Sequence, residues 1–488
     1  MRNCVIQHSA MGKLPLALTK AQDATTVYGE VSLSMHISTF DDVVFFMESF
    51  TNLEKQTDHY TTRNYRLDRM FELLRHLGNP EKSFRAIHLA GSKGKGSTAS
   101  YLACALTALG HKTGLYLSPH LIDYRERFTL AGTFFSESLL IETGKQLQQM
   151  LSNFTFCDQW GETYPTTFEL YTAYAYLLFK AAGCSWAVIE TGLGGRLDAT
   201  NTIIPEASVL CPIELEHTKI LGNTIAQIAT EKSKIIKQGV PVFIGYEEDE
   251  AMDVFLAEAE LQNSKVHLLC DELTSLSSET TREGESVAYE WLDGRKETLL
   301  LAMRGHVQAQ NSALALLVLR TLGLYDPCIL PAFAKNQIPG RFQQLSSEPN
   351  LYVDGAHTHH SLASLLSSFS HLHQGPDNTV IYGALEDKDH THMVSLVLEH
   401  FSTIIISKPG SYKKSDIGML RTLFEQQAAA SSKPVRIYLI EDNGEALEQA
   451  LALTPRHAAI LVCGSFYLAG GVKAAYEERK EQYESQLA

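Results

Sequence analysis

The sequence predicts an α/β protein with two domains, each built on a mainly parallel sheet covered by helices. Short apolar runs alternate with helical patterns along most of the chain, which favours parallel sheets. The 488 residues are enough for two large domains or three ordinary ones. Pro339 and Gly340 interrupt the alternation within residues 335–344, and this segment is the best candidate for a domain linker.

The first half of the chain begins its regular pattern at about Phe40. Residues 1–39 show no helical period, and we expect a poorly ordered extension there. Apolar residues within 67–77 recur at spacings of three and four, which predicts a helix that ends at Gly78. Strands and helices then alternate: strands at 84–90, 113–117, 186–190, 207–211 and 240–245, and helices at 97–109 and 309–322.

The second half repeats the alternation after the linker. Five strand-like runs separated by helical patterns lie at 350–354, 378–383, 402–407, 435–440 and 458–463. This number of repeats is enough for a doubly wound domain. Just before the linker, the polar residues 271–287 are expected to form an exposed loop in a β-rich excursion. The predicted division is an extension at 1–39, a first domain at 40–335 and a second at 336–488.

Composition and charge exclude several classes of protein. The 56 acidic residues outnumber the 41 basic ones and give a net charge of −15, the opposite of what nucleic acid or anionic lipid attracts. No apolar run approaches the roughly 18 residues that cross a bilayer, and the first twenty residues lack the apolar core of a signal peptide. The eight cysteines form no C-x-x-C pair. We therefore expect a cytoplasmic monomer with buried, reduced thiols and no nucleic-acid or membrane partner.

The segment GSKGKGST, residues 91–98, is the first candidate for chemistry. It does not match the G-x-x-x-x-G-K-[ST] pattern, because position 89 is leucine and Gly96 separates Lys95 from Ser97. A glycine-rich turn between a strand and a helix still lets backbone N–H groups converge on an anion. Lys95 would neutralise phosphate charge, and Ser97 or Thr98 would offer a hydroxyl to Mg²⁺. The alternative is a flexible surface turn.

The segments 190–201 and 216–237 hold further candidates. ETGLGGRLDATN fails the dinucleotide pattern G-x-G-x-x-G, because position 197 is leucine. Glu190 ends a buried-looking strand, where α/β sheets place ligands, and its carboxylate suits Mg²⁺. Taken alone, however, Glu190 is more typical of a charged residue at a solvated strand end. His217 and Lys232 are each, by themselves, typical of ordinary structural or solvated residues.

The second domain offers charged residues near the linker and at strand ends. Arg341 can reach across a cleft to a phosphate, and Asp354, at the end of a strand, is placed for a ribose or a metal. The three histidines within 357–360 are not enough for a zinc site without other ligands. Residues 387–389, Asp-Lys-Asp, would follow a strand and face the cleft, or form an exposed polar loop.

Several of these segments occur in one order over about residues 64–389: LGNPEKSFRAIHLAGSKGKGST, YLSPHL, ETGLGGRLDATN, LGNTIAQIATEKSKIIK, PGRFQ, VDGAH and DKD. In that order they resemble the folylpolyglutamate synthase/dihydrofolate synthase family, the folate branch of the Mur ligase superfamily. The resemblance covers nearly the whole chain from about residue 40. It implies an N-terminal P-loop-type ATPase domain with a mainly parallel sheet and a C-terminal Rossmann-like α/β domain.

The resemblance also implies a reaction, in which ATP phosphorylates a folate-linked carboxylate and the amine of L-glutamate attacks the acyl phosphate. The implied ATP site comprises Gly91, Gly94, Lys95, Gly96, Ser97, Thr98, Asn311, Arg341, Asp354 and His357. The implied Mg²⁺ positions are Ser97, Ser118, Glu190 and His217. Lys95, His217 and Lys232 fall on catalytic positions, with Lys232 carbamylated, and Phe168 lies in a stretch near the pteridine pocket.

Four departures from the family pattern stand close to these positions. The chain has Ser92 and Lys93 in place of T-N, Glu216 in place of an aspartate, Lys234 after Lys232, and Thr358 in place of an asparagine. Two helical positions separate Lys234 from Lys232, so the two side chains should point apart. We expect folylpolyglutamate synthesis as the main activity, with dihydrofolate synthesis from dihydropteroate as a further one. The alternatives are another Mur-type amino-acid ligase and a nucleotide-binding regulatory protein without ligase turnover.

Overall fold

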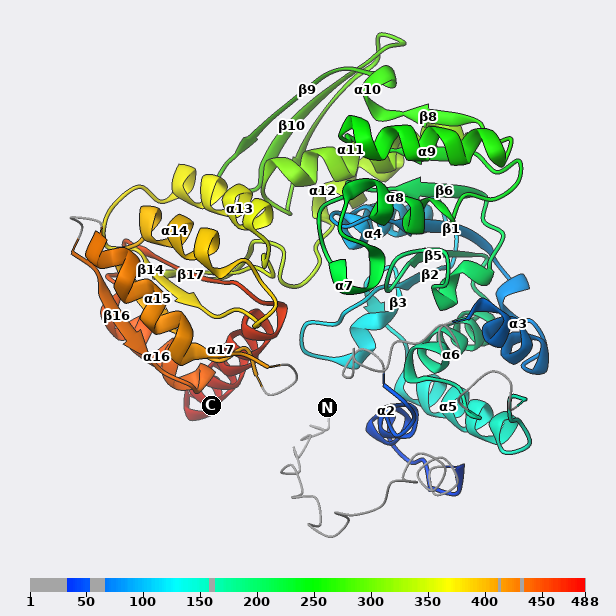
Figure 1. The fold of residues 1–488 in the computed structure, drawn as a ribbon, viewed down its shortest axis with the longest axis horizontal. Coiled ribbons are helices and arrows are strands. Elements are labelled where there is room, and N and C mark those ends of the chain that lie inside the picture. The colour runs from blue at the N-terminus through cyan, green and yellow to red at the C-terminus, as the bar shows by residue number, and fades with distance from the viewer. Residues whose placement is uncertain (1–32, 53–65, 158–162, 411–413, 431–433, 488) are drawn as a thin grey trace.

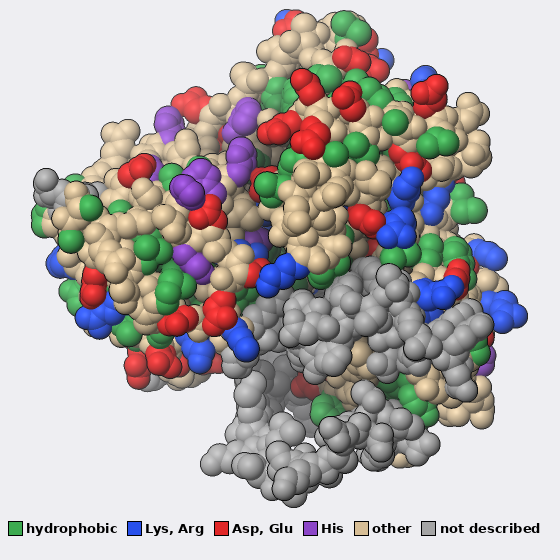
Figure 2. Space-filling model, in the orientation of Figure 1, with side chains coloured by type: hydrophobic (Ala, Val, Ile, Leu, Met, Phe, Trp, Pro, Cys, Tyr) green, Lys and Arg blue, Asp and Glu red, His purple; other side chains and the backbone are tan. Residues whose placement is uncertain are grey.

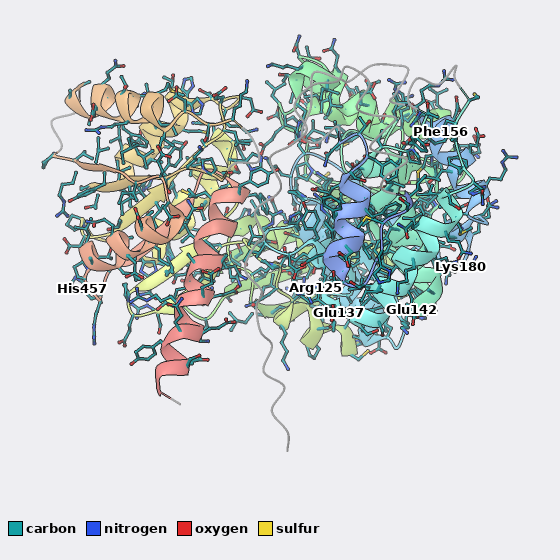
Figure 3. All side chains as sticks on the ribbon, turned by 90° about the horizontal axis from the view of Figure 1, so that it is seen from below. Arg125, Glu137, Glu142, Phe156, Lys180 and His457 are labelled. Carbon is teal, nitrogen blue, oxygen red and sulfur yellow. The ribbon has the colours of Figure 1, made fainter. Side chains whose placement is uncertain are left out.

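The computed structural model describes residues 33–52, 66–157, 163–410, 414–430 and 434–487. It consists of two α/β lobes that lie side by side (Figure 1). Seen from below, Lys180 lies on the N-terminal lobe and His457 on the far side of the C-terminal lobe (Figure 3). The predicted α/β class with two sheet domains is confirmed. Of the predicted extension, residues 1–32 lie outside the described residues.

The N-terminal lobe is built on a sheet with the strand order β4-β3-β2-β5-β1-β6-β7-β8. The strands are β1 (Arg85–Ala90), β2 (Thr113–Tyr116), β3 (Phe128–Leu130), β4 (Thr133–Phe134), β5 (Trp186–Glu190), β6 (Ala207–Leu210), β7 (Val242–Ile244) and β8 (Val266–Leu268). Along the sheet, β2, β5, β1, β6, β7 and β8 are each parallel to their neighbours in this run. β3 and β4 form an antiparallel edge beside β2. The predicted strands of this half are confirmed, and β3, β4 and β8 were not predicted.

Helices cover both faces of this sheet. They are α2 (Phe40–Glu48), α3 (Leu67–His76), α4 (Lys95–Ala108), α5 (Glu137–Leu151), α6 (Thr167–Ala182), α7 (Thr218–Leu221), α8 (Ile225–Ser233), α9 (Asp249–Leu261), α10 (Leu269–Glu272), α11 (His306–Thr321) and α12 (Leu330–Lys335). Alternate residues of β5 enter different cores: Ile189 packs with α6, whereas Val188 packs with α4 and α11. Strands buried on both faces explain the continuous apolar runs in the sequence.

A small antiparallel sheet packs against α11 (Figure 1). It contains β9 (Leu273–Thr280), β10 (Glu285–Trp291) and β11 (Lys296–Leu301), in the order β11-β10-β9. The predicted exposed loop at 271–287 is therefore wrong for most of its length, although the excursion is β-rich as expected. The polar residues of β9 lie largely on the solvent side, while Val287, Tyr289 and Trp291 of β10 supply the core. Pairing with β10 gives β9 its backbone hydrogen bonds, so few apolar side chains are needed.

The C-terminal lobe has a sheet with the order β12-β13-β17-β14-β15-β16. Its elements are β12 (Gln343–Ser347), β13 (Asn350–Val353), α13 (His359–Leu372), β14 (Thr379–Tyr382), α14 (His390–His400), β15 (Thr403–Ile406), α15 (Ile417–Ala430), β16 (Arg436–Leu439), α16 (Asn443–Leu453), β17 (Ala459–Cys463) and α17 (Phe466–Leu487). One core lies under α13, α14 and α15, and another under α16 and α17, so the predicted doubly wound arrangement is confirmed. The antiparallel edge strand β12 was not predicted and begins inside the expected linker.

The cysteines in the described part of the chain are free thiols. Cys184, Cys211 and Cys463 are buried, whereas the exposed Cys157, Cys270 and Cys328 contradict the expectation of buried thiols. Among the described helices, none combines the length and the apolar character that crossing a membrane requires.

Candidate active site

A cleft of about 450 Å³ lies between the two lobes, and residues from both line it. The hollow is visible between the two halves of the molecule in Figure 2, with histidine side chains beside it on the C-terminal half. Its lining includes all the predicted ATP, metal, catalytic and folate positions except Gly91 and Thr98. Most of them follow the carboxyl ends of strands, because parallel strands present those ends at one edge of a sheet.

The glycine-rich turn connects β1 to α4 and leaves the start of that helix open. Gly91 has φ +151°, and a Cβ there would lie 2.6 Å from the Cβ of Cys211. Gly94 has φ +81°, and its Cβ would lie 2.3 Å from Oδ1 of Asn311. Only glycine fits both positions. No side chain caps the first turn of α4 and no acidic residue lies in it, so its backbone N–H groups can bind an anion.

Lys95, which is half-buried, and Glu190, which is buried, form a charged pair beside this turn. The Nζ atom of Lys95 donates to the carbonyl oxygen of Gly91 at 2.9 Å and lies 3.7 Å from Oε1 of Glu190. Oε2 of Glu190 accepts the N–H of Ser118 at 3.2 Å. Burial raises the pKa of Glu190, and the charge of Lys95 and the Ser118 hydrogen bond oppose this. The carboxylate is thus held in a place where a cation is favourable.

Lys232 approaches the same carbonyl group from α8. Its side chain is 2% exposed, and its Nζ donates to Gly91 O at 2.7 Å and to Oε1 of Glu216 at 3.1 Å. Burial lowers the pKa of Lys232 to about 8, although the carboxylate of Glu216 opposes the change. Burial would raise the pKa of Glu216, but Lys232 and Lys95 hold it far below its ordinary value.

The end of α8 that carries Lys232 is fixed by the GLGGR segment. A Cβ on Gly195 would lie 2.8 Å from the carbonyl oxygens of Glu231 and Lys232. Arg196 donates from its Nε to the carboxylate of Glu231 at 3.0 Å. This close approach explains why glycine is needed at position 195, in a segment that does not match the dinucleotide-binding pattern. Lys234 pairs with Glu258 instead, so the prediction that it points away from Lys232 is confirmed.

In the C-terminal lobe the predicted residues cluster around the loop that follows β13. The guanidinium carbon of Arg341 lies 4.4 Å from the ring centroid of Phe466. Burial lowers the pKa of Arg341, and Asp354 and Glu190 oppose this. Asp354 accepts the N–H groups of Phe342 and Ala356, each at 2.7 Å. Its carboxylate therefore holds the turn that carries Arg341.

His357 and Asn311 complete the predicted nucleotide residues. His357 donates from Nδ1 to the carbonyl oxygen of Gly355 at 2.7 Å. Burial lowers its pKa well below the ordinary value, and the charges of Lys93 and Lys388 add to this effect, so the ring is neutral. The side-chain amide of Asn311, on α11, donates to Gln308 Oε1 at 3.3 Å.

The predicted metal residues supply one carboxylate. Ser97 is buried in the first turn of α4, Ser118 follows β2, and His217 precedes α7 with φ +48°. Thr98 is turned away and accepts from the thiol of Cys211 at 3.8 Å. No group of three or more His, Cys, Asp or Glu side chains suited to a metal occurs in the described ranges. A Mg²⁺ ion here would therefore need oxygens from a bound nucleotide or water.

Phe168 stands apart from the other aromatic residues of α6. It is half-buried and lines the cleft, and a Cβ on Gly192 would lie 2.2 Å from the tip of its ring. Tyr171, Tyr174 and Tyr176 of the same helix are buried in the core. Of these four aromatic residues, Phe168 therefore reaches the cleft, while the three tyrosines belong to the core.

The remaining C-terminal candidates lie partly outside the cleft. Lys388 and His360 line it, whereas Asp387 pairs with Lys388 at 3.3 Å and Asp389 pairs with His392 at 2.8 Å. His359 is exposed. Of residues 387–389, only the lysine therefore reaches the cleft.

The sequence did not single out two further residues of the cleft, Glu214 and Lys93, as site residues. The Nζ atom of Lys93 lies 3.9 Å from Oε2 of Glu214, and the hydroxyl of Thr358 donates to the same oxygen at 3.1 Å. Glu214 and Glu216 follow β6 at alternate positions, which could have marked them as strand-end ligands. The sequence does not show that β6 lies next to β1, so it could not place these two glutamates beside the phosphate turn.

Comparisons with known proteins give consistent results. Residues 340–466 match the family "Mur ligase, glutamate ligase domain". The chain is 33% identical over 335 residues to the dihydrofolate synthase/folylpolyglutamate synthase of Bacillus subtilis, covering 67% of this chain and 77% of that protein. It is 31% identical over 441 residues to the folylpolyglutamate synthase of Lacticaseibacillus casei, covering 89% and 98%. The solved structure of Mycobacterium tuberculosis folylpolyglutamate synthase with ADP and AMPPCP has a TM-score of 0.78 at 28% identity, covering 86% of this chain and 97% of that one.

Proposed function

Since the chain belongs to the folylpolyglutamate synthase/dihydrofolate synthase family of Mur-type ligases, we propose that it uses ATP to add L-glutamate to a folate and releases ADP. One observation carries the proposal: the phosphate turn, Lys95 and Glu190 of one lobe share a cleft with Arg341 of the other. We further propose the domain division 40–335 and 336–488, a monomeric state and a cytoplasmic location.

The geometry supports ATP binding across the two lobes. The open first turn of α4 and Lys95 suit the phosphates, and Arg341 can add a second, planar cation from the opposite wall. Asn311 stands against the phosphate turn, while Asp354 and His357 stand at the end of β13. These residues would hold the nucleotide so that its γ-phosphate points into the cleft.

The reaction needs an activated carboxylate, because a free carboxylate is inert to an amine. A carboxylate oxygen of the folate attacks the γ-phosphorus, the bond from that phosphorus to the bridging oxygen breaks, and ADP leaves. The neutral amine of glutamate then attacks the acyl carbon, a C–N bond forms, the nitrogen releases a proton, and phosphate departs with the carboxylate oxygen. Two anions meet in the first step, so Lys95 and Arg341 are needed to offset their repulsion and stabilise the transferring charge.

The residues at this edge of the sheet also fit Mg²⁺. Glu190 is buried and close to the first turn of α4, since a Cβ on Gly96 would lie 3.4 Å from its Oε2. Ser97, Ser118 and His217 surround the same wall of the cleft. Bound there, Mg²⁺ would supply positive charge to the transferring phosphoryl group.

The surroundings of Lys232 support our proposal that its side chain carries a carbamate. Burial lowers the pKa of Lys232 to about 8, so more of its amine is neutral near pH 7 than for an ordinary lysine. The neutral amine attacks the carbon of CO₂, an N–C bond forms, and a proton is released. The product is an anion beside Glu216, and this pair of anions would attract a divalent cation.

The position of Phe168 supports our proposal that the pteridine ring of the substrate binds beside it. Its ring is the aromatic surface that α6 presents to the cleft, and a flat heterocycle can stack on such a ring. We propose tetrahydrofolate as the main substrate, with dihydropteroate as a further one. The carboxylate of dihydropteroate lies closer to the pteridine than that of a folate, so a bifunctional enzyme needs a second pteridine position.

The test is ATP turnover with a panel of folates, dihydropteroate and amino acids, with the products weighed by mass spectrometry. We expect ADP release that depends on both tetrahydrofolate and glutamate, and a product heavier by one glutamate. Activity on dihydropteroate alone would contradict the main assignment, and turnover with a different amino acid would indicate another Mur-type ligase. ATP binding without turnover on any substrate would indicate a regulatory protein.

A further inference from the structure

Glu214 connects the two lobes at the cleft. Its Oε2 accepts the hydroxyl of Thr358, in the C-terminal lobe, at 3.1 Å and lies 3.9 Å from Nζ of Lys93, in the phosphate turn. Its own carbonyl oxygen accepts the hydroxyl of Ser92 at 3.1 Å. We name Lys93, Glu214 and Thr358 the Glu214 bridge.

On the N-terminal side the bridge is joined firmly to the phosphate turn. The N–H groups of Ser92 and Lys93 both donate to the carbonyl oxygen of Pro212, at 2.8 and 3.1 Å. The N–H of Ile213 donates to Oε2 of Glu247 at 2.7 Å. These hydrogen bonds join the loop after β6 to the phosphate turn, so the backbone of Glu214 is held in a fixed place relative to that turn.

On the C-terminal side Thr358 is fixed by its place at the start of α13. Its Oγ1 accepts the N–H of Ser361 at 3.3 Å and so caps the helix. A hydroxyl has one proton and two acceptor positions. The same oxygen lies 2.8 Å from Oγ of Ser361, whose hydroxyl can donate to it. With the N–H and the hydroxyl of Ser361 on its two acceptor positions, Thr358 donates its proton to Glu214, so these hydrogen bonds can exist together.

We propose that Glu214 is a positioning residue that sets the distance between the phosphate turn and the nucleotide-binding loop of the second lobe. Arg341, Asp354 and His357 are on the same lobe as Thr358, whereas Lys95 is on the same turn as Lys93. A nucleotide that touches both groups binds best when the lobes are already held at the right separation. The inference rests on the proposed ATP site, but not on the identity of the folate or the amino acid.

The test is a double-mutant cycle on AMPPCP binding, measured by isothermal titration calorimetry without folate or glutamate. Glu214→Ala and Thr358→Ala should each weaken binding roughly tenfold, the size of a hydrogen bond to a charged group. The double variant should bind no more weakly than the worse single one. Loss of the α13 cap occurs in both backgrounds and cancels in the cycle. Additive effects would overturn the proposal, because they would mean that each residue contacts the nucleotide independently.

Two conservative variants distinguish loss of the Glu214 bridge from a folding defect. Thr358→Ser retains the hydroxyl, so it should bind AMPPCP within about threefold of the unmodified chain. Glu214→Gln keeps an acceptor but loses the charge, so it should bind more weakly than the unmodified chain and more tightly than Glu214→Ala. Binding by both conservative variants as weak as that of the alanine variants would contradict the bridge.

A measurement without nucleotide separates this inference from the proposed function. In small-angle X-ray scattering of the unliganded protein, Thr358→Ala and Glu214→Ala should each increase the radius of gyration, and Thr358→Ser should not. Unchanged scattering in both alanine variants would overturn the bridge. Failure of ligase turnover would overturn the proposed function and leave this result unaffected.

Discussion

The two lobes supply charge to the cleft in different ways. In the N-terminal lobe, Lys95 and Lys232 come from separate helices, both donate to the carbonyl of Gly91, and pair with Glu190 and Glu216. In the C-terminal lobe, Arg341, Asp354 and His357 lie within one short stretch of sequence, and local backbone groups orient two of them.

This difference indicates a division of work. A buried network assembled from distant parts of a rigid sheet holds charges within tight limits, which transition-state stabilisation requires. A local loop on a second lobe can follow the movement of that lobe, which suits binding and closure. We therefore expect substitutions in the N-terminal network to act mainly on kcat, and substitutions in the C-terminal loop to act mainly on KM for ATP.

The largest effect is expected from Lys95→Ala. Loss of the cation beside the phosphates should lower kcat by roughly two to three orders of magnitude, while the fold persists because Lys95 lies at the start of α4 rather than in a core. Steady-state ADP release measures this, with the exposed Lys145→Ala on α5 as the matched control. A folded Lys95→Ala protein with near-normal turnover would refute the role of the phosphate turn.

Substitution of Lys232 is expected to have the second-largest effect on activity. A carbamate replaces a cation by an anion, so both Lys232→Ala and Lys232→Arg should lose activity, and short carboxylates should partly rescue the alanine variant. Full activity of Lys232→Arg would show that no carbamate is needed.

The carbamate also predicts a dependence on pH. The pKa of Lys232 lies below its ordinary value, at about 8, so the neutral amine that reacts with CO₂ increases as the pH rises towards and through 8. Enzyme depleted of CO₂ should therefore regain activity faster on addition of bicarbonate at pH 8 than at pH 6.5, at equal dissolved CO₂. Equal rates at both pH values would contradict the mechanism.

Arg341→Lys tests the other side of the comparison. The variant keeps the charge but loses the planar, bidentate group, so KM for ATP should rise roughly tenfold with a smaller change in kcat. A fall in kcat as large as that of Lys95→Ala, at unchanged KM, would show that the two lobes do not divide the work.

Phe168→Ala should act on the folate alone. Loss of a stacking ring should raise KM for tetrahydrofolate about fivefold to tenfold and leave KM for ATP unchanged. Tyr174→Phe, which changes a core residue of the same helix, is the control. If Phe168→Ala alters the kinetics of neither folate nor dihydropteroate, the pocket assignment fails.

Lys93→Met should have the smallest effect. The Lys93–Glu214 pair is partly exposed, and such pairs contribute about 1 kcal/mol or less, so KM for ATP should rise less than fivefold. An effect larger than that of Glu214→Ala would place Lys93 in direct contact with the nucleotide.

Much of the fold was predictable because buried parallel strands leave continuous apolar runs with helical patterns between them. β9 and β12 were missed because β9 is largely exposed, β12 is half-buried and both consist mainly of polar residues. Hydrogen bonds to a partner strand stabilise each of them. For the site, strand ends and glycine spacing indicated Lys95 and Glu190. Glu214 and the shared Gly91 carbonyl depend on which strands are neighbours, and the sequence pattern does not contain that information.

The most direct test of the central claim is the transfer of oxygen from the folate to phosphate. Tetrahydrofolate labelled with ¹⁸O in the reacting carboxylate is incubated with enzyme, ATP and glutamate, and the phosphate released is weighed by mass spectrometry. If the carboxylate is activated by phosphorylation in this cleft, each phosphate carries one ¹⁸O atom. Phosphate without ¹⁸O, formed alongside a folate that has gained a glutamate, would contradict the mechanism.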